Sequence, residues 1–394
     1  MSVPSFEVVC VSLTSYTNAF TKSTVELMNE LARHHRVLYV DFAVSVKDLV
    51  TGRLRNGWKK VVGLDERLAR VELSHGGTLH VLTPPPVLPV NWMQPGVLHG
   101  FAQGFNTYWL AAEIRAAMKR LAFDRPVVIN AFHPINGLAL AGRLNERALV
   151  YYCYDDIYAE SWSRHHGPLS EAALIRQADA VIASSRELQL RKTTDTTPCY
   201  LLENGVDYPL FQQAFHLPTP KPVQTVGYIG AIDNRLDLDL LGTCFQRFPE
   251  VQFQFVGRQP DAAIRAFFEP YANVTLSPPV APSQLPAFVE TFDAALIPFV
   301  CNQQTKAIYP LKVNEYLAAG LPVVSTLFSD LSDFAGVVAL ADSPEDFCEA
   351  LKGALADTRP EEARKRSAFA RTNSWEERGK RLEQILGEVL RDKR

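Results

Sequence analysis

Short apolar runs alternate with helical patterns in both halves of this 394-residue chain, and this rhythm limits the fold more than any other feature. In the first half, apolar runs at 8–12 and 36–41 flank a stretch with helical periodicity. In the second half, the runs at 226–230 and 253–257 flank another. Buried strands that alternate with helices are typical of parallel sheets with helices on both faces. The sequence therefore predicts an α/β protein with two doubly wound, Rossmann-like domains.

A proline-rich stretch separates the two halves. Residues 208–222 contain four prolines and show little periodicity, so we interpret them as a hinge. We expect residues 1–207 to form the first domain and residues 208–374 the second. Residues 375–394 have the pattern of a charged amphipathic helix that could pack back across the hinge. In open α/β sheets, ligands bind beyond the carboxyl ends of the strands, so the expected site is the cleft between the domains.

The composition is ordinary for a soluble globular protein, with 47% hydrophobic and 21% charged residues. A formal net charge of −3 gives no reason to expect nucleic acid as a partner. The six cysteines lie mostly in apolar runs, which indicates buried, reduced thiols in a cytoplasmic protein. No stretch approaches the roughly 20 apolar residues of a membrane span, and the N-terminus lacks the pattern of a secretion signal.

Residues 310–324 predict a short helix followed by a buried strand. Pro310 suits the first helical turn, and Gly320 suits the position just past the helix end. Lys312 and Glu315 are three residues apart, so they share a helix face near its N-terminus. A lysine at a helix N-terminus suits a diphosphate, and a nearby carboxylate could accept hydrogen bonds from sugar hydroxyls. An ordinary surface ion pair is the alternative that this spacing leaves open.

Two other strand ends in the second half carry glycine and arginine. Gly227 and Gly230 precede Arg235, so the backbone could approach a phosphate that the arginine also reaches. Arg258 follows the next strand and is expected to point into the same cleft. A tight turn and a surface arginine are the alternatives. The chain has no P-loop pattern.

The first half carries its candidate residues in loops that follow buried strands. His133 follows the run at 127–130, and Asp155 and Asp156 follow the run at 149–154. These side chains could bind a hydroxyl group or remove its proton, while a structural histidine and a helix cap are the alternatives. The sequence has no zinc-site pattern, and its first half has no clear D-x-D motif, so no metal is expected.

Two segments of the first half could meet a membrane or a lipid. Residues 47–60 combine lysines and arginines with Trp58, as do segments that lie on anionic membrane surfaces. Residues 91–109 are rich in aromatic side chains and could dock a lipid-linked acceptor. A solvated loop is the alternative for the first segment, and core packing is the alternative for the second.

The order of these motifs resembles that of the GT-B glycosyltransferases. The closest group is glycosyltransferase family 4 enzymes of the teichuronic-acid and exopolysaccharide type, which build bacterial surface polysaccharides. The motifs that carry the resemblance are Asn204-Gly-Val-Asp207, Gly227-Tyr-Ile-Gly230, Phe255-Val-Gly257, Leu296-Ile-Pro298-Phe299 and Pro310–Val324. Asp155-Asp156 and residues 178–185 also match, so the resemblance covers the second half closely and the first half mainly in rhythm.

The resemblance implies metal-independent, retaining transfer of a hexosyl group from a nucleotide-diphosphate sugar, most simply a UDP-sugar, with no further cofactor. Lys312, with Arg235 or Arg258, would neutralise the leaving diphosphate, and Glu315 would hold the ribose. The glycan or lipid-linked acceptor would bind the first domain near His133 and Asp155. The remaining residues expected at the donor site are Gly230, Val280, Tyr309, Pro310 and Leu311.

One position departs from the family pattern. The family commonly carries a glutamate eight residues before the ribose-binding one, and here that position is Ala307. Thr305, Lys306 and backbone amides are expected to replace it, and the identity of the donor sugar stays open. A sugar-nucleotide epimerase of GT-B fold and a non-catalytic nucleotide- or glycan-binding homologue are the alternative functions. The expected location is the cytoplasm, with peripheral contact at the inner face of the membrane.

Overall fold

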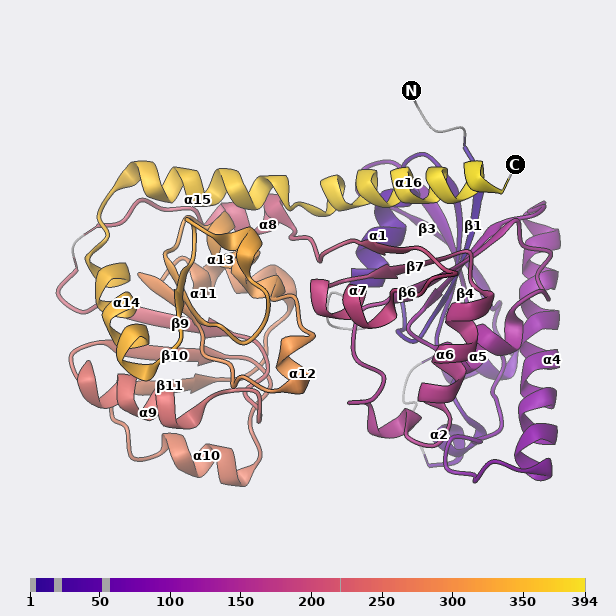
Figure 1. Ribbon diagram of the computed structural model, residues 1–394, viewed down its shortest axis with the longest axis horizontal. Coiled ribbons are helices and arrows are strands. Elements are labelled where there is room, and N and C mark those ends of the chain that lie inside the picture. Colours follow the sequence, from indigo (N-terminus) through magenta and orange to yellow (C-terminus); the bar gives the residue numbers. More distant parts are fainter. Residues whose placement is uncertain (1–4, 18–22, 52–56, 220, 394) are drawn as a thin grey trace. The chain divides into compact units, whose positions relative to one another are not determined.

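The computed structural model describes residues 5–17, 23–51, 57–219 and 221–393, and the chain divides into two compact domains (Figure 1). The first domain contains residues 1–203 together with 378–394, and the second contains residues 204–377.

The first domain is built on an eight-stranded sheet in the order β3-β4-β2-β1-β5-β6-β7-β8. All neighbouring strands are parallel except β3 and β4, which are antiparallel. Its strands are β1 (Glu7–Ser12), β2 (Arg36–Val40), β3 (Leu68–Glu72), β4 (Thr78–Leu82), β5 (Val127–Ala131), β6 (Ala148–Cys153), β7 (Ala180–Ala183) and β8 (Cys199–Leu201). Its helices are α1 (Ser23–Leu31), α2 (Val46–Val50), α3 (Trp58–Val62), α4 (Val97–Arg120), α5 (Pro134–Leu140), α6 (Gly167–Gln177) and α7 (Arg186–Lys192).

The second domain is built on a six-stranded parallel sheet in the order β11-β10-β9-β12-β13-β14. Its strands are β9 (Thr225–Ile229), β10 (Gln252–Val256), β11 (Val274–Ser277), β12 (Ala294–Ile297), β13 (Val323–Thr326) and β14 (Ala339–Ala341). Its helices are α8 (Tyr208–Phe211), α9 (Leu238–Arg247), α10 (Ala262–Phe268), α11 (Leu285–Val289), α12 (Gln303–Lys306), α13 (Leu311–Ala318), α14 (Pro344–Ala356) and α15 (Pro360–Thr372). The predicted α/β class with two parallel sheets is confirmed.

The last helix, α16 (Trp375–Asp392), begins in the second domain and belongs to the first from Arg378 onward. In the first domain it packs closely on α1, because a Cβ atom on Gly379 would lie 2.5 Å from the Glu30 Cβ. Its Glu383 carboxylate also lies 3.5 Å from the buried ring of His35. Among the described helices, none combines the length and the apolar character needed to cross a membrane.

The first part of the predicted hinge, residues 208–214, is helical in the structure and is not a flexible linker. Residues 208–214 form α8 and a short 3-10 turn, and Phe211 and Ala214 are buried in the second domain's core. The chain passes between domains earlier, after Glu203. Proline at the first turn of α8 is compatible with a helix, so Pro209 marks a helix start here rather than a linker.

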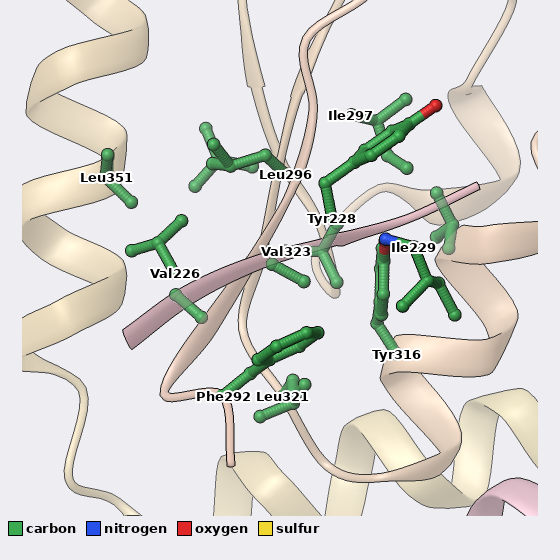
Figure 2. Close-up of a cluster of buried hydrophobic side chains, with 14 of the residues drawn as sticks. Val226, Tyr228, Ile229, Phe292, Leu296, Ile297, Tyr316, Leu321, Val323 and Leu351 are labelled. Atoms are coloured by element: carbon green, nitrogen blue, oxygen red, sulfur yellow. The ribbon is translucent and has the colours of Figure 1, made fainter. Parts of the chain in front are cut away.

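Aromatic and branched side chains fill the core of the second domain (Figure 2). Tyr316 of α13 points toward β9, where its hydroxyl oxygen accepts a hydrogen bond of 2.7 Å from the Ile229 amide. Gly227 lies within β9, and a Cβ atom there would lie 2.0 Å from a ring carbon of Phe292. Gly227 therefore serves core packing, and the expectation that it helps the backbone approach a phosphate is wrong.

Replacement of Gly227 by alanine should lower the free energy of unfolding by about 1–3 kcal/mol, because the new methyl group overpacks the contact with Phe292. Gly353→Ala is the matched control, since a Cβ atom at that position of α14 meets no other atom within 4 Å. The control should be neutral or gain up to about 1 kcal/mol from helix propensity. Urea denaturation measures both, and equal stabilities for the two variants would contradict the packing role.

Candidate donor site

The candidate site of the second domain lies at the carboxyl end of β9, beside β12. These two strands are neighbours in the sheet, and the chain continues from β9 to β10 on one side and from β12 to β13 on the other. Such a reversal of strand order is where open α/β sheets bind ligands. Gly230 follows β9, Phe299 follows β12, and α13 begins at Leu311.

Two glycines let two strand ends and the Lys312 side chain approach closely at this point. A Cβ atom on Gly230 would lie 2.0 Å from the Lys312 Cε, and one on Gly257 would lie 1.9 Å from the Gly230 carbonyl oxygen. Their φ angles of 137° and 153° are also ones that other residues rarely adopt. The stem of Lys312 therefore lies directly on the glycine turn after β9, which Gly230 was predicted to form.

The ammonium group of Lys312 is held between aromatic rings. Its Nζ lies 5.6 Å from the centroid of the Tyr228 ring and 5.8 Å from that of Phe299. Burial, followed by the positive charge of Arg235, lowers the pKa of Lys312 to about 8, although Glu315 and Asp233 act in the opposite direction. A cation that is poorly hydrated and close to a second cation is well placed to bind an anion.

The Asp233 carboxylate pairs with both candidate arginines, Arg235 and Arg258. It accepts two hydrogen bonds of 2.8 Å from the Arg235 guanidinium and one of 3.2 Å from Arg258. Burial alone would raise the pKa of Asp233, but the hydrogen bonds and charge of Arg235, and the charge of Arg258, lower it. Arg258 remains 71% exposed, so its guanidinium keeps donors for a ligand. Sequence reasoning missed Asp233, although an acidic residue two positions before an arginine was a visible signal.

Glu315 lies one turn after Lys312 on α13. Burial raises the pKa of Glu315 to about 7, although the charge of Lys312 opposes the shift. The interaction between these two groups agrees with the predicted shared face. The carboxylate that a ribose contact requires is thus the dominant form only above neutral pH.

The turn that leads into α13 differs from the prediction. Pro310 has an extended conformation, with ψ at 99°, and stands before the helix, whose first residue is Leu311. The prediction that Pro310 lies in the first turn therefore starts the helix one residue too early. Tyr309 is buried, and its carbonyl oxygen accepts a hydrogen bond of 3.4 Å from the Asn204 side chain. Asn204 thus supports the turn. Gly320 has a φ of 81° just past the helix end, as predicted.

The remaining donor-site candidates lie in surrounding loops and in α12. Lys306 is an exposed residue of α12, and the neighbouring Ala307 side chain is buried. The position where the family has a glutamate is therefore filled by a methyl group inside the fold. Val280 is half-buried and packs against the core. Asp237 caps α9 by accepting a hydrogen bond from the Leu240 amide.

The first domain holds its candidate residues at the ends of β5 and β6. His133 is buried, and its Nδ1 accepts a hydrogen bond of 3.3 Å from the Asn136 amide at the start of α5. Burial lowers the pKa of His133 to about 4, so the ring is neutral and carries its proton on Nε2. Its ring lies 5.5 Å from that of Trp162 and 6.3 Å from that of Phe42.

Asp155 and Asp156 have different surroundings. Asp156 is buried and pairs with Arg191 at 2.7 Å, which makes it a structural residue. Asp155 is half-buried, and one of its oxygens accepts a hydrogen bond from the Asp156 amide. A residue that sequence reasoning missed is Asp41, after β2, where burial raises the pKa to about 6 although the Tyr16 amide donates to its carboxylate.

The chain is similar in sequence to known glycosyltransferases. Residues 223–357 match the family model described as glycosyl transferases group 1. The second domain is a group 1 glycosyltransferase domain. Over 267 residues, the chain is 28% identical to TuaH of Bacillus subtilis (strain 168), which is provisionally named a teichuronic acid biosynthesis glycosyltransferase. That alignment covers 61% of this chain and 67% of TuaH.

Solved structures with similar folds cover nearly the whole chain. Sucrose-phosphate synthase from Thermosynechococcus elongatus has a TM-score of 0.67 at 15% identity, over 98% of this chain and 100% of its own. HepE from Anabaena, solved in complex with UDP and glucose, has a TM-score of 0.66 at 14% identity, over 97% and 99% of the two chains. At these identities the likeness shows the fold alone, and that fold is GT-B. The predicted resemblance to GT-B glycosyltransferases is confirmed.

Lys312→Met should raise the free energy of unfolding at pH 7 by about 1–3 kcal/mol, because it removes a poorly hydrated charge. The folded-state pKa of about 8 lies below the ordinary 10.5 of a lysine, so the wild type gains stability relative to the variant between these pH values. Urea denaturation at pH 7 and pH 10 measures the difference, which should shrink at the higher pH. Lys352→Met, at an exposed lysine of α14, is the control and should change neither value. A destabilised Lys312→Met variant would contradict the electrostatic assignment.

Proposed function

We propose that this glycosyltransferase moves a hexose from a UDP-sugar to a glycan or lipid-linked acceptor in the synthesis of a bacterial surface polysaccharide. Transfer proceeds with retention at the anomeric carbon and takes place in the cytoplasm, at the inner face of the membrane. The observation that carries the proposal is the Lys312 ammonium, which lies beside the glycine turn after β9 with Arg235 near it. The relationship to TuaH supports the class of product, and the UDP bound in HepE supports the choice of nucleotide.

The diphosphate of the donor binds at Lys312, Arg235 and Arg258. As the bond between sugar and phosphate breaks, negative charge grows on the departing diphosphate. Cations that are already fixed in place stabilise that charge without reorganisation, and this is how they lower the barrier. Amides at the start of α13 add to the same field. Because these side chains supply the positive charge, the reaction requires no metal ion.

The nucleoside part of the donor binds beside the diphosphate. Glu315 accepts hydrogen bonds from the ribose hydroxyls, and Val280 lies against the base. Tyr309 and Pro310 shape the turn that the donor passes. Lys306 on α12 contacts the sugar in place of the glutamate that Ala307 replaces.

The acceptor binds at the first domain, beside His133 and Asp155. Because the neutral His133 ring carries its proton on Nε2, it donates a hydrogen bond to the acceptor and positions it. Asp155 binds a second hydroxyl group of the acceptor. On this basis the proton of the attacking hydroxyl goes to the departing diphosphate on the same face of the sugar, which accounts for retention.

The affinity for UDP should fall about tenfold as the pH rises from 7.5 to 9.5, because Lys312 loses its proton through a pKa of about 8. In Lys312→Arg the cation persists, so the affinity of that variant should stay nearly constant over the range. Isothermal calorimetry with UDP measures both profiles. Parallel profiles for wild type and Lys312→Arg would exclude Lys312 as the titrating ligand group.

Lys312→Ala should lower turnover of the UDP-sugar at least tenfold, since the departing diphosphate loses one fixed charge. Lys352→Ala, a surface lysine outside the site, should leave turnover unchanged. Release of UDP is measured for a panel of UDP-sugars with and without EDTA, and turnover should survive the chelator. Loss of all turnover with EDTA would overturn the metal-free mechanism, and full activity of Lys312→Ala would overturn the role of the lysine.

A further inference from the structure

One face of α4, in the first domain, exposes a continuous row of large apolar side chains. The first sixteen residues of this helix, 97–112, contain no Asp, Glu, Lys or Arg. The exposed fraction is 77% for Leu98, 79% for Phe101 and 68% for Tyr108, and Phe105 and Trp109 are also exposed. Figure 1 shows α4 as a long helix in the first domain, and it contacts α5 there. The sequence alternative of core packing for residues 91–109 is therefore wrong for these side chains.

The spacing of these residues places them on one side of the helix. Leu98, Phe101, Phe105 and Tyr108 follow one another at intervals of three, four and three residues, which aligns them along a single face. The opposite face is buried and packs on the domain through Leu110, Ile114, Ala117 and Met118, among others. We call the exposed row, together with Trp109, the α4 stripe. Trp92, just before the helix, is 70% exposed as well.

The short helix α3 lies beside the stripe and adds basic and aromatic side chains. Arg67 pairs with Glu113 of α4 at 3.3 Å and donates hydrogen bonds to the carbonyl oxygens of Lys60 and Val61 in α3. This contact holds α3 on the flank of α4 that also carries Trp109, four residues before Glu113. On α3, Trp58 and Lys59 are exposed. Arg53 and Arg55, part of the basic segment found in the sequence, lie outside the described residues.

The charge of this surface has the opposite sign to that of the whole chain. Residues 57–67 and 97–120 contain six lysines and arginines and three acidic residues, an excess of three positive charges, whereas the whole chain has a net charge of −3. On α4 the exposed cations, Arg115, Lys119 and Arg120, follow the uncharged half of the helix. Exposed tryptophan, tyrosine and phenylalanine next to lysine and arginine is the combination that favours the interface of an anionic bilayer.

We infer that the α4 stripe and α3 form a docking surface for an anionic lipid bilayer. This rests on the proposed function, in which a lipid-linked acceptor would lie in such a bilayer, and it adds the surface and the lipid charge. The aromatic side chains insert at the level of the headgroups, and Lys59, Arg115 and Lys119 contact lipid phosphates. A second copy of the chain is the competing occupant, but the excess of like charge on the surface opposes self-association.

Flotation of the whole protein with vesicles tests the inference. Wild type should bind vesicles that contain phosphatidylglycerol and bind phosphatidylcholine vesicles at least tenfold more weakly, and 0.5 M salt should reduce the difference. Leu98→Ser combined with Phe101→Ser should weaken binding about tenfold or more. Leu190→Ser is the matched control, because this leucine of α7 is 75% exposed on the same domain. Lys59→Glu combined with Lys119→Glu should abolish the preference for anionic vesicles, whereas Lys352→Glu in the second domain should not.

Two measurements on the same samples separate the outcomes. Light scattering without lipid should show one oligomeric state for wild type and for the Leu98→Ser/Phe101→Ser variant. Dissociation of an oligomer by that variant would overturn the inference in favour of a protein interface, and equal vesicle binding by variant and wild type would overturn it outright. The affinity for UDP is measured in parallel. Vesicle binding without UDP binding would refute the proposed function and leave the membrane surface standing, and the reverse result would do the opposite.

Discussion

The contact of the Lys312 stem with the glycine turn after β9 is the constraint on which the candidate site depends. Neither Gly230 nor Gly257 leaves room for a side chain, so the ends of β9 and β10 approach to backbone distance and the Lys312 side chain of α13 packs on the Gly230 turn. Tyr316 of the same helix also contacts this strand end, because its hydroxyl oxygen accepts a hydrogen bond from the amide of Ile229, one residue before Gly230. Lys312 and Tyr316 are four residues apart on α13, so one helix face both fixes the strand end and delivers the cation to it.

The charged groups around this contact, Lys312 and Glu315 among them, lower the stability of the folded state because burial disfavours their ionised forms. Lys312 is poorly hydrated and close to Arg235, and Glu315 is buried enough that neutral pH leaves it partly protonated. Asp233 offsets part of the repulsion by binding both arginines. A site with surplus positive charge and fixed geometry is the arrangement expected where charge develops on a leaving group. Binding of an anion would relieve this unfavourable electrostatic arrangement.

The fold could be predicted from the sequence because its strands are continuous apolar runs and its helices carry clear stop signals, such as Gly320. Lys312 and Glu315 could be chosen because their motif stands in order with others. Features set by contacts across the chain could not. Nothing in the sequence tells that Gly227 makes room for Phe292 while Gly230 makes room for Lys312, since both belong to the same Gly-x-x-Gly pattern. Likewise the neighbouring Asp155 and Asp156 differ only through Arg191, which lies 35 residues away along the chain from Asp156.

The two points where the chain enters and leaves the second domain lie side by side. Val206 and Ser374 form a parallel bridge, and the Val206 amide and carbonyl bind Asn373 and Trp375 respectively. The second domain is therefore an insertion in the first domain, and the two chain segments that connect it lie next to each other. An inserted domain of this kind can be replaced by the corresponding domain of a related protein without a change in the path of the chain. The binding properties of the second domain can then change as a unit, while α16 and the first domain stay as they are.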